Sequence, residues 1–297
     1  MTDAPATPAL GIDWIAALMG AAFAVMWASA FTSARIIVAA APPLWSLSAR
    51  YWIAGGVAVL LALAFGQSAR LTRSQWRATI LFGICQNALY LGFNFVAMRT
   101  IEASLATIVA STLPLLVAAV MLARGERLPR LGAAGLVLGF AGVALVMGTR
   151  ISGGVDLAGL AFCVAGVIAL TFATMMVAGA TSGGNVLMVV GLQMLVAAAV
   201  LTPAAALLEP LAVDPSWRLA IAFGYTLLVP GLIATFVWLT LVRRIGATRA
   251  AVFHFLTPPV GVGIAWALLG ERIGGADLIG VAVVAAGILM VQLSKRA

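Results

Sequence analysis

Residues 249–272 read RAAVFHFLTPPVGVGIAWALLGER, an apolar run interrupted by Thr-Pro-Pro and ended by Gly-Glu-Arg. Residues 104–127 repeat this pattern as SLATIVASTLPLLVAAVMLARGER. Adding 145 to a residue number superimposes Pro114 on Pro259 and aligns the two Gly-Glu-Arg motifs without a gap. Such an internal repeat indicates that one structural unit is used twice.

The composition places the chain in a membrane. Of the 297 residues, 64% are hydrophobic and only 9% are charged, whereas a soluble globular domain carries about 25% charged residues. The apolar runs are continuous over about 20 residues, as transmembrane helices require, and do not alternate as the strands of a membrane barrel do. The sequence therefore predicts an all-α integral membrane protein.

Ten apolar spans can be counted, and the repeat divides them into two units of five. An odd number of spans per unit makes the second unit enter the membrane from the opposite side, so we expect two inverted repeats. We place the first repeat at residues 1–150 and the second at 151–297, together forming one membrane domain. The expected spans are residues 12–39, 43–66, 76–98, 102–123, 130–149, 157–179, 184–208, 217–243, 247–269 and 275–294.

Loop charges predict the orientation of the spans. With the N-terminus inside, the inner loops and the C-terminal tail carry eleven basic residues and the outer side carries six. Because basic residues collect on the cytoplasmic side, we expect both termini in the cytoplasm. The six residues assigned to the outer side are Arg35, Arg50, Arg99, Arg150, Arg218 and Arg272.

The remaining charges and the cysteines argue against several functions. The formal net charge is +8, but the charged residues lie at the ends of apolar runs and form no patch, so no nucleic-acid partner is expected. Cys85 and Cys163 lie inside spans without another Cys or His at metal-ligand spacing, which favours packing roles. No nucleophile motif accompanies His254, the single histidine. We expect no metal, no cofactor and no enzymatic activity.

Acidic residues all fall in tails, loops or span ends. A proton- or sodium-driven carrier usually keeps an ionisable group near the middle of the membrane, where its energetic cost marks a functional role. Only His254 is available for that role, with a neutral, structural histidine as the alternative. We expect no inward-facing Arg or Lys at mid-depth, and we expect transport by uniport or exchange.

Span three carries polar groups at helical spacing. Asn87, Tyr90 and Asn94 occupy positions i, i+3 and i+7, which share one face of an α-helix. Buried amides need hydrogen-bonding partners. We expect this face to meet the polar backbone of a substrate, with interhelical hydrogen bonds as the alternative role.

Aromatic residues predict an apolar wall for the same site. Trp27, Trp238 and Phe253 lie well inside spans, away from the interfaces where Trp and Tyr usually gather. We expect them to meet the side chain of the substrate and include the neighbouring His254 among the candidate binding residues. Packing within the bundle is the alternative role.

Prolines and glycines add two further expectations. Pro114, Pro230, Pro258 and Pro259 interrupt spans, and broken helices at matching places in inverted repeats point to hinges around a central site. A seam of small residues predicts close helix packing, with dimerisation through these faces as the alternative. The seam comprises Gly132, Gly135, Gly139 and Gly142 in span five and Gly280 and Gly287 in span ten.

Together these features resemble the EamA family of the drug/metabolite transporter superfamily. The resemblance rests on the ten-span repeat, on proline in the fourth span of each half with Gly-Glu-Arg after it, and on the opening WIAALMGAAFAVMWASAF of residues 14–31. It covers essentially the whole chain. Within the family, the spans are most similar to YddG-type exporters of amino acids, including aromatic ones.

The resemblance implies export of small metabolites across a bacterial inner membrane by alternating access, through a cavity lined mainly by spans three, four, eight and nine. We expect neutral, zwitterionic amino acids as substrates and a monomer in the lipid bilayer, with a homodimer as the alternative. The smaller four-span relatives carry a Glu in their first span, but no Asp or Glu lies between Ile15 and Ala39. The alternative functions are a proton-coupled exporter of drugs or metabolites and, in another class, a membrane-embedded enzyme or sensor.

Overall fold

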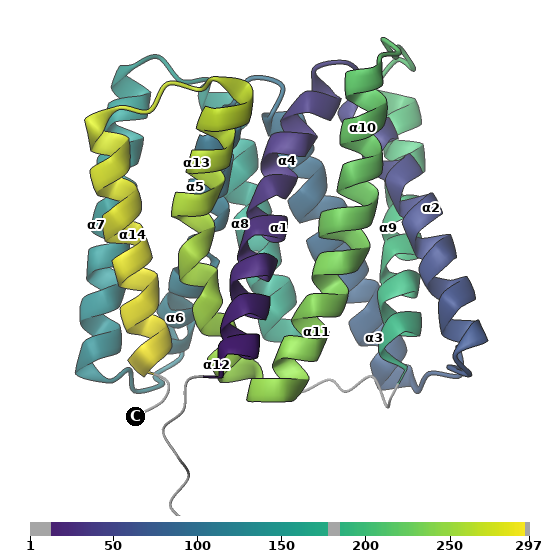
Figure 1. Cartoon of the computed structure of the whole chain (residues 1–297), viewed down its shortest axis with the longest axis horizontal. Helices are drawn as coiled ribbons and strands as arrows, with labels where there is room; N and C mark the ends of the chain where they lie inside the picture. The colour runs from purple at the N-terminus through teal and green to yellow at the C-terminus, as the bar shows by residue number, and fades with distance from the viewer. Residues whose placement is uncertain (1–12, 178–184, 295–297) are drawn as a thin grey trace, which may run out of the picture.

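The computed structural model describes residues 13–177 and 185–294. It contains ten helices or helical stretches long and apolar enough to cross a membrane, which confirms the predicted all-α membrane fold. Six spans are continuous helices: α1 (Trp14–Val38), α2 (Pro43–Ala64), α7 (Arg130–Ser152), α8 (Leu157–Val177), α9 (Val186–Leu208) and α14 (Gly275–Ser294). Figure 1 shows them standing roughly side by side in one bundle.

The other four spans change helical geometry part-way. Span three consists of α3 (Arg73–Phe82), the π-helix η1 (Gly83–Tyr90) and α4 (Leu91–Ala97), and span four of α5 (Ala103–Ala110) and α6 (Leu113–Ala123). Span eight consists of α10 (Trp217–Thr226), the π-helix η2 (Leu227–Ile233) and α11 (Ala234–Ile245). Span nine consists of α12 (Ala247–Ala251), the 3₁₀-helix η3 (Val252–Leu256) and α13 (Thr257–Leu269).

These irregular segments occur at corresponding positions in the two repeats. The shift of 145 carries Gly83, where η1 begins, to residue 228, one residue into η2. It also carries Thr112, between α5 and α6, onto Thr257, the first residue of α13. π-helical turns and mid-span breaks are uncommon and gather at functional positions. Both repeats therefore place their least regular backbone at equivalent depths in the bundle.

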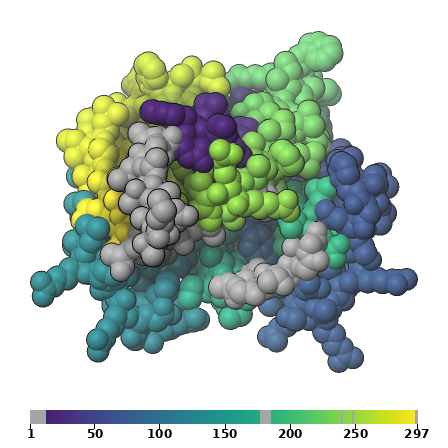
Figure 2. Space-filling model, turned by 60° about the horizontal axis from the view of Figure 1, so that its bottom comes forward, coloured from purple at the N-terminus to yellow at the C-terminus, as the bar shows by residue number. Residues whose placement is uncertain are grey.

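The bundle has two ends, which we name by their loops. The proximal end carries the start of α1, residues 65–72 and 124–129, and Gly246; the distal end carries residues 39–42, 98–102, 153–156, 209–216 and 270–274. The proximal end is at the bottom of Figure 1, and Figure 2 turns it toward the viewer, with the purple start of α1 beside the yellow-green atoms of α11 and α12. Arg244 of α11 forms an ion pair with Asp13 at 2.8 Å, which ties these elements together.

The outer flanks of the bundle are helix pairs that join the two repeats. At one flank α7 packs on α14, and at the other α2 packs on α9 (Figure 1). Glycines allow the close approach, because a Cβ added to Gly287 would lie 2.5 Å from the Cα of Gly139, and one added to Gly142 would lie 2.9 Å from the carbonyl oxygen of Gly280. The prediction of close packing is confirmed. These glycine faces pack on helices of the same chain. A homodimer stays a prediction.

Candidate functional site

A small cavity lies inside the bundle, where the irregular segments of spans three and eight face α1 and α2. Its volume is about 50 Å³, which leaves room for a few water molecules. We call it the central cavity. It is lined by Trp27, Ala30, Phe31, Ala34, Arg50, Tyr90, Leu91, Asn94, Phe95, Met98 and Pro230. Spans one, two, three and eight thus build it, rather than the spans three, four, eight and nine that the family resemblance implied.

Most of the cavity wall is apolar. Trp27 and Phe31 come from successive turns of α1, and Leu91, Phe95 and Met98 follow one another along α4 and its end. Phe31, Phe95 and Met98 are buried. Such a wall accommodates an apolar side chain, whereas a strongly hydrated group would lose its water on entering.

An amide supplies the first polar feature of the cavity. The side-chain Nδ2 of Asn94 donates a 2.7 Å hydrogen bond to the carbonyl oxygen of Tyr90, one helical turn earlier, and this bond orients the amide. The opposite atom of the amide, Oδ1, is buried and has no hydrogen-bond partner. Asn94 therefore presents a free acceptor inside the bundle.

Arg50 supplies the second polar feature, and here the sequence-based prediction was wrong. We assigned Arg50 to the outer side and expected no inward-facing Arg or Lys at mid-depth, but its side chain is buried and lines the central cavity. Arg50 lies seven residues after Pro43, the first residue of α2, which places it about 10 Å inside the helix end. That depth was visible in the sequence, but the loop-charge rule counts residues and ignores where they point.

The predicted polar face of span three is only partly realised. Tyr90 and Asn94 line the central cavity, whereas Asn87 is buried but is not among the lining residues. The expectation of one shared face assumed α-helical geometry. Residues 83–90 instead form a π-helix, whose wider i→i+5 turns rotate Asn87 away from the face of the following α-helix.

The predicted aromatic residues are divided between two places. Trp27 lines the central cavity, but Trp238 and His254 lie outside it, clustered around Phe23. The ring centroid of Phe23 is 4.6 Å from that of Trp238 and 5.4 Å from that of His254. It is also 5.8 Å from the centroid of Trp27, so this aromatic cluster adjoins the cavity on its proximal side.

Two more candidate residues belong to this proximal region. Phe253 packs on Gly20 of α1, since a Cβ there would come within 2.3 Å of the phenylalanine ring. The Nδ1 atom of His254 lies 3.2 Å from the carbonyl oxygen of Ala251, a hydrogen bond within its own helical turn. Phe253 and His254 therefore link η3 to α1 and do not line the central cavity.

The four prolines lie at the irregular segments, as follows. Pro230 lies within η2 and lines the central cavity. Pro114 is in the first turn of α6, and Pro258 and Pro259 are in the first turn of α13, the former buried and the latter exposed. Their action as hinges stays a prediction.

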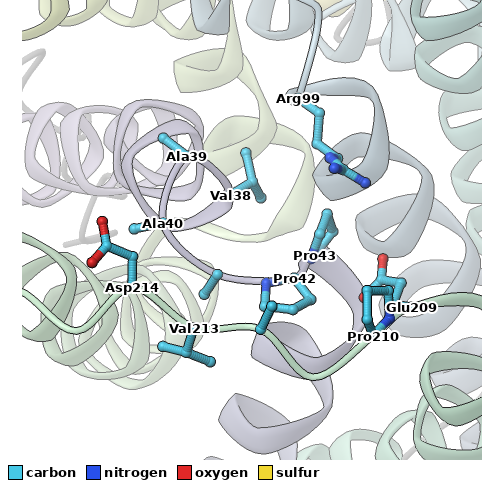
Figure 3. Close-up of a pocket in the computed structure, with 12 residues that line it drawn as sticks. Val38, Ala39, Ala40, Pro42, Pro43, Arg99, Glu209, Pro210, Val213 and Asp214 are labelled. Atoms are coloured by element: carbon cyan, nitrogen blue, oxygen red, sulfur yellow. The ribbon is translucent and has the colours of Figure 1, made fainter.

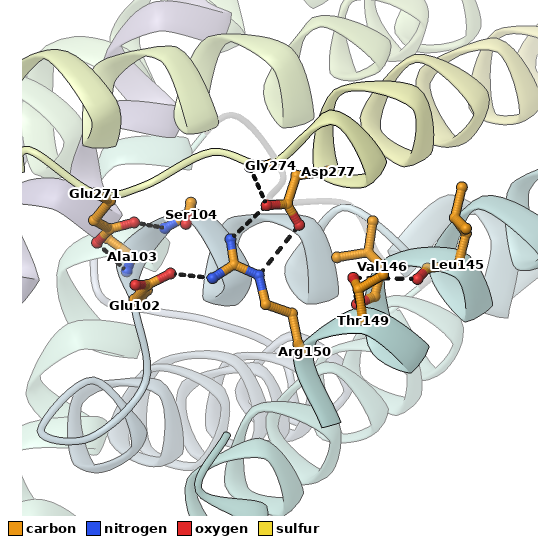
Figure 4. A network of polar contacts seen from close by, with 10 residues as sticks. All are labelled: Glu102, Ala103, Ser104, Leu145, Val146, Thr149, Arg150, Glu271, Gly274 and Asp277. Atoms are coloured by element: carbon orange, nitrogen blue, oxygen red, sulfur yellow. Dashed lines mark hydrogen bonds and ion pairs between the residues drawn. The ribbon is translucent and has the colours of Figure 1, made fainter. Parts of the chain in front are cut away.

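Charged contacts link helix ends at the distal end of the bundle. Arg150, at the end of α7, forms an ion pair with Glu102 and a second, 3.0 Å long, with Asp277 of α14 (Figure 4). The carboxylate of Glu271 accepts hydrogen bonds from the backbone N–H groups of Ala103 and Ser104, at the start of α5. The Arg150–Asp277 ion pair and the Glu271 hydrogen bonds join the first repeat to the second at this end.

A more open pocket of about 410 Å³ lies at the same end. Arg99, Glu209 and Asp214 contribute its charged groups, and Pro42 and Pro43 form part of its wall (Figure 3). Glu209 also accepts a 2.8 Å hydrogen bond from the backbone N–H of Leu44, so its carboxylate stabilises the start of α2. We assign this pocket to the loop surface, because its lining comes from the distal loops and the adjoining helix ends.

The described residues contain no cluster of side chains suited to bind a metal ion. Within residues 13–177 and 185–294, no three His, Cys, Asp or Glu side chains gather as they would around a metal ion. Cys85 and Cys163 are both buried and free.

The sequence matches the model of the EamA-like transporter family over residues 14–148 and again over residues 157–293. The two matches cover most of the chain, one in each repeat. The protein belongs to the EamA-like transporter family.

Relatives of this EamA-family protein are themselves named as transporters. It is 26% identical over 288 residues, covering 94% of this chain and 91% of the relative, to YedA of Escherichia coli (strain K12), an uncharacterized inner membrane transporter. It is 22% identical over 284 residues, with 95% and 92% covered, to the uncharacterized transporter YvbV of Bacillus subtilis (strain 168). One solved crystal structure superimposes with a TM-score of 0.68 at 21% identity, covering 95% of this chain and 99% of the other, which shows a shared fold.

The EamA-family protein is therefore a multi-pass inner-membrane transporter. The names of its relatives agree with the expectation of a transporter rather than an enzyme. Neither the family description nor the names of these relatives state a substrate, so the YddG-type assignment stays a prediction.

Proposed function

We propose that this EamA-family transporter exports neutral, zwitterionic amino acids, including aromatic and other hydrophobic ones, and related small metabolites through the central cavity. The observation that carries the proposal is the cavity wall, which combines aromatic and aliphatic side chains with an unpaired amide oxygen at Asn94 and a buried guanidinium at Arg50. An amino acid with an apolar side chain offers groups that match both kinds of surface.

Alternating access fits the arrangement of the two repeats. Inverted repeats can exchange conformations, so that a central site opens first to one side and then to the other. The irregular turns of spans three and eight border the cavity, where a change in helix geometry would alter it directly. We place the proximal end, with both termini, in the cytoplasm, because the exposed basic residues of the proximal loops outnumber those at the distal end.

Uniport or exchange fits the charges around the cavity better than proton coupling. Among the described residues that line it, none is Asp or Glu. A zwitterionic amino acid carries no net charge, so it can cross without a compensating ion. A proton-coupled exporter of cationic drugs is the alternative, and the positive charge of Arg50 would repel such substrates.

Transport by purified protein in liposomes tests the proposal. The liposomes are loaded with unlabelled leucine, phenylalanine or alanine, and exchange against the labelled amino acid outside is measured, with the cationic dye ethidium as a separate substrate. We expect exchange of leucine and phenylalanine well above protein-free liposomes and none of ethidium. Ethidium transport without amino-acid exchange would instead establish the drug exporter.

The proposed orientation has its own test. Reporter domains that are active on only one side of the membrane are fused to the C-terminus of the full chain. We expect a cytoplasmic signal, and a periplasmic signal would reverse the assignment of the two ends.

A further inference from the structure

Arg50 is a buried cation that has no counter-ion among the described residues. Arg50 is only 6% exposed. Its Nε atom has no hydrogen-bond partner, and in the described part of the chain none of the ion pairs involves it. Among the described residues that line the central cavity, Arg50 alone is charged.

An unpaired guanidinium in this position is energetically unfavourable. Arginine stays protonated in proteins, so it cannot escape the cost of burial by losing its charge. The contacts around Arg50 compensate only weakly. Its guanidinium carbon is 5.4 Å from the ring centre of Tyr51, and its Nη2 would lie 3.4 Å from a Cβ added to Gly231 in η2. An ionisable residue kept at such a cost inside a membrane bundle indicates a functional partner.

Asn94 shows the complementary deficiency. It is only 1% exposed, and its Oδ1 accepts no hydrogen bond while its Nδ2 is held by the carbonyl oxygen of Tyr90. The cavity thus contains a donor that lacks an acceptor, on α2, and an acceptor that lacks a donor, on α4. Unmade hydrogen bonds of buried groups are costly, so a ligand that satisfies both gains from each.

We propose that Arg50 and Asn94 form the binding site for the head group of an α-amino acid, with the guanidinium of Arg50 holding the carboxylate and Oδ1 of Asn94 accepting a hydrogen bond from the ammonium group. This inference rests on the proposed function and specifies its substrate class. The carboxylate and ammonium of an amino acid lie on the same carbon, so one molecule can reach both groups. Its side chain then faces the apolar wall formed by Trp27, Phe31 and Phe95.

The charges predict an order of preference. A carboxylate neutralises Arg50, so a zwitterion and a simple monocarboxylate are both favoured over an amine that lacks the carboxylate. Asn94 then distinguishes the zwitterion from the monocarboxylate, because only the zwitterion can donate a hydrogen bond to Oδ1 of Asn94. Leucine has more non-hydrogen atoms than the present cavity can hold, so the helices around it must separate for binding.

Competition on the unmodified transporter gives the first test. Exchange of labelled leucine in liposomes is inhibited with leucine, leucinamide, 3-methylbutylamine and 4-methylpentanoate. Leucinamide and 3-methylbutylamine lack the carboxylate, and 4-methylpentanoate lacks the ammonium group. We expect each of the two amines to inhibit at least about tenfold more weakly than leucine, as the loss of a hydrogen bond to a charged group predicts, and 4-methylpentanoate to be intermediate.

Two substitutions assign these preferences to residues. Arg50→Gln should lower the affinity of the transporter for leucine by about tenfold or more. It should also bring the ratio of the affinities for leucine and leucinamide close to one. Asn94→Leu should reduce the preference of leucine over 4-methylpentanoate. Arg99→Gln is the matched control, because Arg99 is exposed in the distal loop and outside the central cavity, and it should leave both preferences unchanged.

The outcomes separate this inference from the proposed function. Leucine exchange by the unmodified protein with equal inhibition by leucine and leucinamide overturns the inference and leaves amino-acid export intact. Retention of the full preference by Arg50→Gln overturns the role of Arg50. If that variant fails to insert, the competition series on the unmodified protein still decides whether a carboxylate is recognised. Absence of any amino-acid exchange by the unmodified protein overturns the proposed function itself.

Discussion

The Oε2 atom of Glu271 accepts a 2.9 Å hydrogen bond from the backbone N–H of Ser104, across the boundary between the two repeats. Its Oε1 accepts a second, 2.7 Å long, from the N–H of Ala103. These are the free N–H groups at the start of α5, where a negative charge is favourable. The end of span nine is thereby fastened to the beginning of span four.

The internal repeat identifies the counterpart of this contact at the proximal end. The shift of 145 relates Glu271 to Glu126 and carries residues 103 and 104 to residues 248 and 249. Glu126 is exposed and, in the part of the chain that the structure describes, its carboxylate accepts no hydrogen bond. Among the described residues, the fastening is therefore present at the distal end and has no counterpart at the proximal one, as the proposed alternating access predicts for one of its states.

We predict that Glu271→Ala opens the distal end. The variant leaves two N–H groups of α5 unpaired, so the contact between spans four and nine weakens. A cysteine replacing Ala34, in the cavity wall, in a background lacking Cys85 and Cys163, should react several-fold faster with a membrane-impermeant thiol reagent added from the distal side. Glu126→Ala is the matched control and should leave that rate unchanged; equal acceleration by both variants would contradict the assignment.

Glycine positions on the flanks should differ sharply in their tolerance of a methyl group. Gly287→Ala places a Cβ 2.5 Å from the Cα of Gly139, backbone that cannot move aside without separating α7 from α14. We expect a loss of about 1–3 kcal/mol in the free energy of unfolding, typical of overpacking. Gly148→Ala, on α7, meets nothing within 4 Å and should be neutral or slightly stabilising, because alanine favours helix. Thermal unfolding in detergent measures both, and equal melting temperatures would refute the packing argument.

Asp156 should make the stability of the distal end depend on pH. The Thr100 hydroxyl donates to its carboxylate at 2.6 Å and the Gly159 N–H at 3.1 Å, and these bonds lower the pKa of Asp156 below the ordinary value of 3.8. Because the pKa is depressed in the folded state, the stabilisation is present above pH 3.8 and is lost as the pH falls through the folded value. Thr100→Val should be less stable than the unmodified protein at pH 6, with the difference shrinking below pH 3.8. A difference in melting temperature that stays constant with pH would exclude this carboxylate as its source.

Transport should respond little to a proton gradient. His254 lies outside the central cavity, held between Phe23 and Trp238, with ring centroids 5.4 and 5.0 Å from its own. A histidine that only packs there cannot carry a proton between the cavity and either side. We expect the initial rate of leucine transport to be unchanged by an imposed pH gradient at constant substrate, and His254→Ala to lower it modestly. Proton-driven accumulation of leucine that is lost in His254→Ala would make this residue the coupling site.

The sequence by itself determined the spans, the repeat and their inverted arrangement. The continuous apolar runs and the gapless shift from Pro114 to Pro259 can be read from the chain alone. Because of the hydrophobic effect, apolar runs of this length are stable as helices in the lipid bilayer and not in water. It also selected Trp27, Tyr90 and Asn94, because polar and aromatic groups inside spans need a partner or a cavity.

Only the tertiary structure decided which of the candidates meet. The π-helix of span three leaves Asn87 out of the cavity that Tyr90 and Asn94 line. The packing of η3 on α1 places Phe253 and His254 outside the cavity that Trp27 lines. Arg50 resembles a boundary charge in the sequence, but the approach of η2 at Gly231 encloses it. Hydropathy reports how each residue partitions from water, whereas the surroundings of a buried charge depend on helices distant in sequence.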